Sequence, residues 1–247
     1  AFSLLTQIAT NMANDYYDHI RGADTPDRVG PERLVASGKI SPRAMLLASL
    51  CIFALAFVVG LGLVAYRGWE LLIIGVLSIV FGYGYTGGPF PLAYRGLGDV
   101  FVIVFFGLVA TAGTYYVLLG ELSLPVALLG LALGLLANNI LVVNNYRDYE
   151  TDRAAGKMTL VARFGKGFGR IQYWIQLLVS FLAVLAYAWR EESYWALLPV
   201  FAMPVGAKLA LQLGRASGTA LNAVLARTAA LVLLFGVLAC LGIALSA

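Results

Sequence analysis

Two of the apolar stretches of this sequence end in a cluster of acidic and amide side chains. Each cluster combines one amide and two carboxylates at spacings of three or four residues, which places them on one face of a helix. The clusters are Asn11, Asp15 and Asp18 within NMANDYYDHIRGAD, and Asn144, Asp148 and Asp152 within NNYRDYETDRAAGK. A further amide, Asn14, lies four residues before Asp18.

This combination of side chains predicts a magnesium site. Carboxylates that converge repel one another unless a cation lies between them, and oxygen-only ligands favour Mg2+. The negative ends of two helix dipoles add to that preference. The predicted metal ligands are Asp15, Asp18, Asp148 and Asp152. Mg2+ in such sites keeps water molecules and takes its remaining ligands from a substrate phosphate.

Basic residues follow each cluster and suit a diphosphate that is neutralised from two sides. They are Arg28, Arg33 and Lys39 after the first cluster, and Lys157 and Arg163 after the second. Two simpler interpretations stay open. The acids could snorkel at a membrane interface beside neighbouring arginines, and the basic residues could only anchor the chain on the cytoplasmic side.

The composition is that of a membrane protein. Of the 247 residues, 61% are hydrophobic and 12% are charged, and the mean hydropathy is +0.85. Soluble globular domains have about 45–50% apolar and about 25% charged residues. These values exclude an ordinary soluble protein and a disordered one. We expect one transmembrane domain over residues 1–247, without a nucleic-acid partner.

Eight apolar runs are long enough to cross a bilayer, which takes about 20 residues for each crossing. Segments rich in proline, glycine and charge separate them. The runs cover residues 1–20, 42–66, 69–85, 97–119, 124–147, 169–189, 194–213 and 226–246. The sequence therefore predicts an all-α polytopic bundle of eight membrane helices.

The basic residues predict the orientation of these helices. Fifteen of the 17 Lys and Arg residues fall in connections after the odd-numbered runs, and only Arg67 and Arg190 fall in the others. Cytoplasmic loops hold such residues in excess, so the basic connections are placed in the cytoplasm. Four runs separate the two acidic clusters, which puts both on the cytoplasmic side. We expect the two helices to face each other across a central cavity open to that side.

Three long strings carry a family resemblance. NMANDYYDHIRGAD, YTGGPFPLAYRGLGDVFVIVFFGLVATAGTYYV and NNYRDYETDRAAGKMTLVARFG resemble the UbiA superfamily of intramembrane prenyltransferases, and in particular its branch that prenylates 1,4-dihydroxy-2-naphthoate. Many superfamily members have a third acid where this chain has Gly22, and the nearest acid here is Asp24. The family has nine helices, and its first normally precedes the Asn-Asp helix, so we expect that helix to be missing upstream.

The resemblance implies a reaction. A polyprenyl group would pass from prenyl diphosphate to dihydroxynaphthoate with Mg2+ as cofactor, releasing diphosphate and CO2 and giving a demethylmenaquinone for menaquinone biosynthesis. The membrane would be the bacterial inner or plasma membrane. The expected catalytic residues are Asp15, Asp18, Asp148, Asp152, Lys157 and Arg163. The expected substrate-binding residues are Asn11, Asn14, Arg28, Arg33, Lys39, Asn144 and Tyr146.

The loop within YTGGPFPLAYRGLGD either caps the site or is a plain tight connection. Asp99, at its end, is either an acceptor-side residue or a helix N-cap. Aromatic faces near the cytoplasmic ends could shield a carbocation, and the candidates are Tyr83, Tyr85, Tyr146 and Tyr149. Each tyrosine could equally belong to an interfacial belt.

Other functions remain open. A related enzyme could use 4-hydroxybenzoate, homogentisate, a chlorin or haem as its acceptor. A transporter or cation channel could also use intramembrane carboxylates, although its site would lie near the membrane midplane rather than at one face. A passive scaffold would leave the two Asn/Asp clusters without a role. Turnover of dihydroxynaphthoate and a prenyl diphosphate with Mg2+ distinguishes these alternatives.

Overall fold

The computed structural model describes residues 1–24 and 29–246, and all regular secondary structure in this part of the chain is helical. The long helices are α1 (Phe2–Ile20), α2 (Pro42–Arg67), α3 (Glu70–Gly84), α6 (Leu124–Arg147), α9 (Lys166–Arg190), α10 (Met203–Arg215) and α11 (Ala220–Ser246). Shorter segments are η1 (Ala93–Arg95), α4 (Gly98–Val102), η2 (Ile103–Val109), α5 (Ala110–Leu119), α7 (Tyr149–Ala154), α8 (Leu160–Phe164) and η3 (Trp195–Ala202).

Local sequence signals explain several helix ends. The Ser41 hydroxyl accepts a hydrogen bond from the backbone N–H of Ala44, and Pro42 occupies the first turn of α2. Gly120 follows α5 with φ of 82°, a left-handed conformation that glycine adopts without a steric penalty. These signals stand where the sequence predicted helix boundaries.

Six helical stretches in the described part of the chain are long and apolar enough to cross a membrane. They are Pro42–Arg67, Gly98–Leu119, Leu124–Arg147, Lys166–Arg190, Trp195–Arg215 and Ala220–Ser246. All eight predicted runs are helical, but two do not meet these criteria. The apolar helix α3 has only 15 residues, and α1 carries Asp15, Asp18 and several amides on its polar face.

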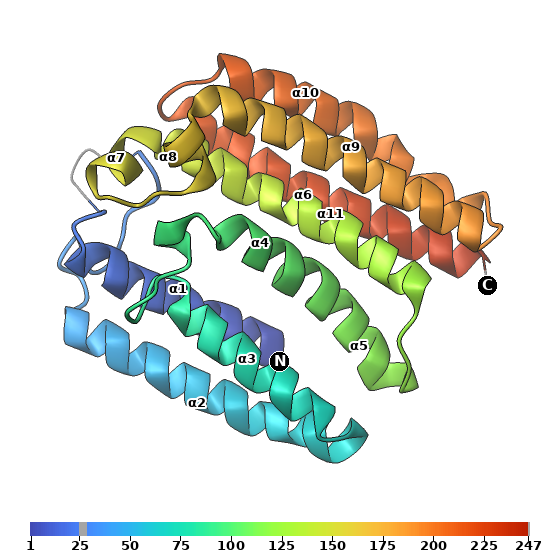
Figure 1. Ribbon diagram of the computed structural model, residues 1–247, viewed down its shortest axis with the longest axis horizontal. Coiled ribbons are helices and arrows are strands. Elements are labelled where there is room, and N and C mark those ends of the chain that lie inside the picture. Colours follow the sequence, from blue (N-terminus) through green and yellow to red (C-terminus); the bar gives the residue numbers. More distant parts are fainter. Residues whose placement is uncertain (25–28, 247) are drawn as a thin grey trace. The chain divides into compact units, whose positions relative to one another are not determined.

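The described residues form two compact units, and each is described by itself. Unit 1 comprises Ala1–Gly98 and Glu150–Thr159. Within it, α1, α2 and α3 pack against one another (Figure 1). Ala9 and Ala13 are fully buried in α1, where their small side chains allow close approach. The Ser49 hydroxyl of α2 donates to the Ala9 carbonyl at 2.8 Å.

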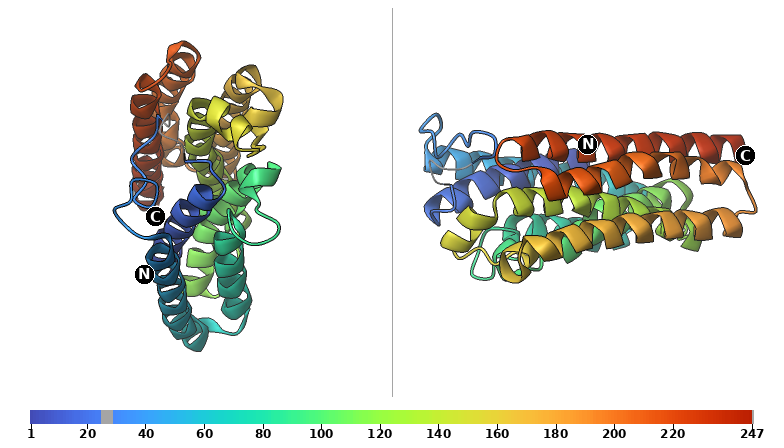
Figure 2. Two further views of the ribbon diagram at one scale, coloured as in Figure 1. Left: turned by 90° about the vertical axis from the view of Figure 1, so that its left-hand side faces the viewer. Right: turned by 90° about the horizontal axis from the view of Figure 1, so that it is seen from above.

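Unit 2 comprises Asp99–Tyr149 and Leu160–Ala247. Its long helices run side by side (Figure 2), and α6 contacts α9, α11 and η2. The π-helical segment η2 crosses α6 at Gly107 and Gly134, where a Cβ atom on Gly107 would collide with the backbone of α6. Tyr173, Leu177 and Phe235 are among the largest side chains buried in this unit.

Candidate active site

The carboxylates of α1 lie at the polar end of unit 1. Asp15 and Asp18 are 6% and 3% exposed. Asp15 accepts hydrogen bonds from the backbone N–H groups of Leu34, at 3.1 Å, and Val35, at 3.4 Å. The segment at Leu34 and Val35 therefore lies against the end of α1 and fixes this carboxylate.

Both oxygens of Asp18 are engaged by side chains that come from distant parts of the sequence. Tyr94 donates its hydroxyl to Oδ1 at 2.9 Å, and Lys157 donates its ammonium to Oδ2 at 3.2 Å. The guanidinium of Arg33 lies 3.7 Å from the same Oδ2. Three separate loops thus supply donors or positive charge to one buried carboxylate.

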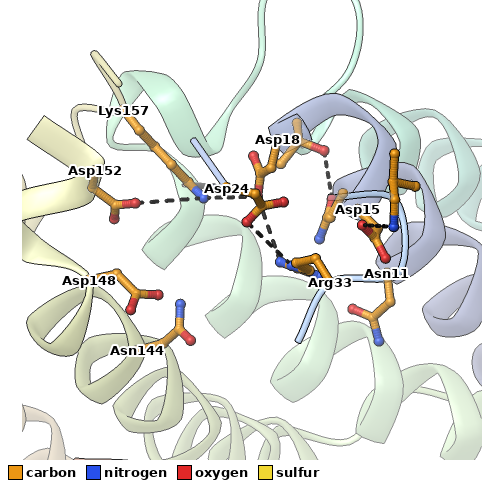
Figure 3. A network of polar contacts seen from close by, with 12 residues as sticks. Asn11, Asp15, Asp18, Asp24, Arg33, Asn144, Asp148, Asp152 and Lys157 are labelled. Atoms are coloured by element: carbon orange, nitrogen blue, oxygen red, sulfur yellow. Dashed lines mark hydrogen bonds and ion pairs between the residues drawn. The ribbon is translucent and has the colours of Figure 1, made fainter. Parts of the chain in front are cut away.

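Lys157 links the two acidic clusters within unit 1. Its ammonium lies 3.2 Å from Asp18 and 4.0 Å from Oδ1 of Asp152. Figure 3 shows the lysine side chain reaching between these carboxylates. The backbone N–H of Met158 donates to the Tyr94 carbonyl at 3.2 Å, so the lysine loop and the tyrosine loop are joined beside the site.

The electrostatic surroundings keep Lys157 charged and Tyr94 neutral. Burial alone would lower the pKa of Lys157, but attraction by Asp18 and Asp152 and the hydrogen bond to Asp18 outweigh it and raise the pKa. Burial, the negative charge of Asp18 and the hydrogen bond to it raise the pKa of Tyr94 far above its usual value. Tyr94 is consequently a hydrogen-bond donor at neutral pH.

The loop between α3 and α4 is tied to α1. Thr86 donates its hydroxyl to Asn14 Oδ1 at 2.7 Å. Arg21 donates to the carbonyls of Thr86 and Gly88. The Arg21 guanidinium also lies 4.9 Å from the centre of the Tyr94 ring. The loop therefore packs on the site residues of unit 1 rather than forming a bare connection.

The second cluster differs from its prediction in one respect. The helix expected to carry all three residues ends at Arg147, with Asp148 at its C-cap, and Asp152 lies on the separate helix α7. The prediction that Asn144, Asp148 and Asp152 form one continuous stripe on a single helix was therefore wrong. The chain turns at Asp148, so Asp148 belongs to unit 2 and Asp152 to unit 1.

Arg147 organises the polar end of α6. It donates two hydrogen bonds of 2.7 Å to the two oxygens of Asp148. It also donates to Asn144 Oδ1 at 2.8 Å and to Asn222 Oδ1, on α11, at 2.9 Å. Asn144 and Asp148 lie next to each other in Figure 3. This bidentate pair fixes the Asp148 carboxylate at the end of its helix.

The remaining predicted residues lie in different places. Lys39 is exposed and pairs with Glu32 at 2.6 Å, and Asn11 is exposed on α1. Arg163 is exposed on α8 of unit 2, and Tyr146 is buried in the core of that unit. Arg28 lies outside the described residues.

Sequence reasoning missed three contributors to the site. Tyr94 and Arg21 occupy strings that carried the family resemblance, but nothing in their spacing marked them as partners of Asp18 or its neighbours. Asp24, noted only as a displaced acid, lies 3.7 Å from Nε of Arg33. A contact between residues so distant in sequence has no periodic signature.

The donor atoms of unit 1 suit a small hard cation together with an anionic ligand. Asp15, Asp18 and Asp152 offer only oxygen, and the space between Asp18 and Asp152 already accommodates the positive charge of Lys157. Within residues 1–24 and 29–246, no three Asp, Glu, His or Cys side chains gather closely enough to hold a metal by themselves. A metal bound here would take further ligands from water or from a substrate phosphate.

Comparisons with known proteins give the family and the relatives to which this chain is similar. Residues 1–231 match the UbiA prenyltransferase family. The chain is 39% identical to the 1,4-dihydroxy-2-naphthoate octaprenyltransferase of Escherichia coli, over 98% of this chain and 81% of that protein. It is 39% identical to the Haemophilus influenzae protein of the same name, over 85% and 70% of the two chains. It is also 30% identical to UbiA prenyltransferase domain-containing protein 1 of Gallus gallus, over 96% and 70%.

Proposed function

Because the chain belongs to the UbiA prenyltransferase family, we propose that this membrane prenyltransferase transfers a polyprenyl group to 1,4-dihydroxy-2-naphthoate in menaquinone biosynthesis. Its relatives from Haemophilus influenzae and Escherichia coli carry the name of that acceptor, and each is 39% identical to this chain. The observation that carries the catalytic part is the Lys157 ammonium, which lies between Asp18 and Asp152 with Arg33 beside it.

The donor side of the reaction requires stabilisation of a leaving diphosphate. The bond between C1 of the prenyl group and the diphosphate oxygen breaks, and its electron pair leaves with the diphosphate. Lys157 and Arg33 supply fixed positive charge where that negative charge develops. Mg2+, when bound, supplies further positive charge; its proposed ligands are Asp15, Asp18 and Asp152, and Asp148 remains a proposed ligand from the sequence. Tyr94 positions Asp18 through its hydroxyl.

The acceptor side of the reaction forms a carbon–carbon bond. The electron-rich ring of dihydroxynaphthoate attacks C1 of the prenyl group, and the carboxyl group leaves as CO2 while its bonding electrons stay with the ring. The products are diphosphate, CO2 and demethylmenaquinol, the reduced form of a demethylmenaquinone. Burial among helices keeps water from the prenyl cation. Asn11, Asn14, Asn144 and Tyr146 remain proposed substrate-binding residues, together with Arg28, Lys39 and Arg163.

The location of the reaction follows from the distribution of charge. The loops that carry Arg33 and Lys157 belong to the basic connections, so we place this end of the protein in the cytoplasm of a bacterium. A soluble aromatic acid and the diphosphate head group of the donor both reach such a site from water. The prenyl chain stays in the bilayer, where its apolar surface is favourable.

The test is a turnover assay with the purified full chain in lipid nanodiscs. The reaction contains a prenyl diphosphate, Mg2+ and one acceptor, and released diphosphate and the prenylated product are measured together. We expect dihydroxynaphthoate to be prenylated, and 4-hydroxybenzoate and homogentisate to be turned over at least tenfold more slowly. Prenylation of 4-hydroxybenzoate in preference to dihydroxynaphthoate would reject the acceptor but keep the family chemistry. Lys208→Gln is the matched control for Lys157→Gln because Lys208 is an exposed lysine of α10 and has no proposed role in the site.

A further inference from the structure

Unit 2 contains a buried polar cluster that the proposed chemistry leaves unused. Asp99, at the start of α4, is 4% exposed. Its Oδ1 accepts a hydrogen bond from the amide nitrogen of Asn138, on α6, at 3.0 Å, and another from that of Gln172, on α9, at 2.6 Å. Three helices that are long and apolar enough to span a membrane thus meet at one carboxylate.

Every unsatisfied side-chain atom in this cluster is an acceptor. The amide oxygens of Asn138 and Gln172 have no hydrogen-bond partner, and neither do those of Asn139 and Gln176. These four side chains are between 0% and 8% exposed. Gln176 lies one helical turn beyond Gln172 on the same face of α9. Buried polar atoms are nearly always paired, so these four oxygens are available as ligands for a water molecule or an ion.

The charge of the cluster is also uncompensated. In the described part of the chain no Lys or Arg forms an ion pair with Asp99. The two side chains that donate to it are neutral amides. A buried carboxylate without a positive partner is costly. Water could satisfy the amide oxygens, but it would leave the negative charge unbalanced.

We propose that this cluster binds one monovalent metal cation, Na+ or K+, between α4, α6 and α9. One carboxylate and several neutral amide oxygens give a net charge of −1, which a single monovalent ion neutralises. Neutral carbonyl-type oxygens replace the hydration shell of such ions in membrane proteins. Mg2+ gives up its waters reluctantly and favours sites with carboxylates and phosphates, so this amide-rich set suits it poorly. The bound ion would tie three helices of unit 2 together.

Thermal unfolding of the wild-type chain provides the test. The purified protein, free of Mg2+ and in an uncharged detergent, is heated in increasing NaCl or KCl, with N-methylglucamine chloride holding the ionic strength constant. We expect a saturable rise of the unfolding midpoint, by roughly 5–10 °C at a hundredfold excess over the dissociation constant for a chain of this size. A midpoint that depends only on ionic strength would overturn the proposal, because a proton or water would then satisfy the cluster.

Variants locate the ion. Asp99→Asn should abolish the cation dependence, whereas Glu191→Gln, which removes an exposed carboxylate, should retain it. Asp15→Asn should also retain it, which separates this ion from any cation bound at the carboxylates of unit 1. Loss of the dependence in Asp15→Asn with its retention in Asp99→Asn would reject the site.

A second variant covers the case in which Asp99→Asn does not fold. Gln176→Met keeps similar volume and touches no hydrogen bond of Asp99. It should raise the salt concentration needed for half the stabilisation by about tenfold, and binding of radioactive 22Na+ should weaken in parallel. An unchanged concentration for half-stabilisation would contradict the role of the amide oxygens.

Discussion

Replacing Tyr94 with phenylalanine tests how the site holds its central carboxylate. The substitution removes the hydroxyl that donates to Asp18 at 2.9 Å. It keeps the aromatic ring, whose centre lies 4.9 Å from the Arg21 guanidinium and 5.5 Å from the Lys157 ammonium. The loop geometry and the cation–π contacts should therefore survive, and only the orientation of Asp18 should be relaxed.

The expected loss follows from the type of hydrogen bond. A hydrogen bond to a charged group contributes about 1.5–3 kcal/mol. If Asp18 must keep its orientation in the transition state, that loss lowers kcat/KM for the prenyl diphosphate by about 10- to 150-fold, at about 1.4 kcal/mol for each factor of ten. The Mg2+ concentration that gives half-maximal turnover should rise, because a less ordered carboxylate is a poorer ligand.

Steady-state turnover and thermal unfolding are measured on the same purified samples. The matched control is Tyr115→Phe, whose hydroxyl donates at 3.3 Å to Glu121 in an exposed position, and kcat/KM should stay within twofold there. The reasoning is refuted if Tyr94→Phe has wild-type kcat/KM per folded molecule. A lower unfolding midpoint with unchanged turnover would make the hydrogen bond structural only.

Three further substitutions or treatments test the surrounding groups. Lys157→Gln should insert and fold but lose about 10²–10³-fold in kcat. Equal turnover per folded molecule in Lys157→Gln and in the control Lys208→Gln would exclude a role of Lys157 in neutralising diphosphate. Chelation with EDTA should abolish prenyl transfer and added Mg2+ should restore it, so product formation in EDTA within a few-fold of the untreated rate would contradict the metal role. Asp148→Ala should lower the unfolding midpoint, because it leaves the buried Arg147 without its carboxylate partner. The cost of about 3–5 kcal/mol corresponds to a drop of roughly 6–20 °C. A midpoint within 2 °C of the wild type would show that this pair contributes little.

The sequence was sufficient for the helical runs and for several of their ends, although the run predicted from residue 226 is a helix that begins at Ala220. Hydropathy is a property of consecutive residues, so the runs predicted at 42–66 and 124–147 agree with Pro42–Arg67 and Leu124–Arg147. Capping residues such as Ser41 act within four residues of themselves and are visible in the same way. The acidic clusters were also visible, because charged side chains are rare within apolar sequence.

Helical spacing could not reveal that the second cluster is divided. Spacings of four predict one stripe only while the helix continues, and no proline or glycine lies between Asp148 and Asp152 to indicate a break. In the tertiary structure Arg147 binds Asp148 at the end of α6, whereas Lys157 lies between Asp152 and Asp18 of α1. The Arg147–Asp148 pair is local, but Lys157 reaches Asp18 across 139 residues of sequence, and helical spacing carries no sign of such a contact.

Partners contributed by loops and by other helices were likewise decided by the tertiary structure alone. Tyr94 reaches Asp18 across 76 residues of sequence, and Gln172 reaches Asp99 across 73. Local propensity and periodicity determine which face of a helix is polar, but they are independent of which loop or helix covers that face. The sequence by itself therefore determined the membrane helices and the acidic residues, whereas folding determined which cations, hydroxyls and amides surround each carboxylate.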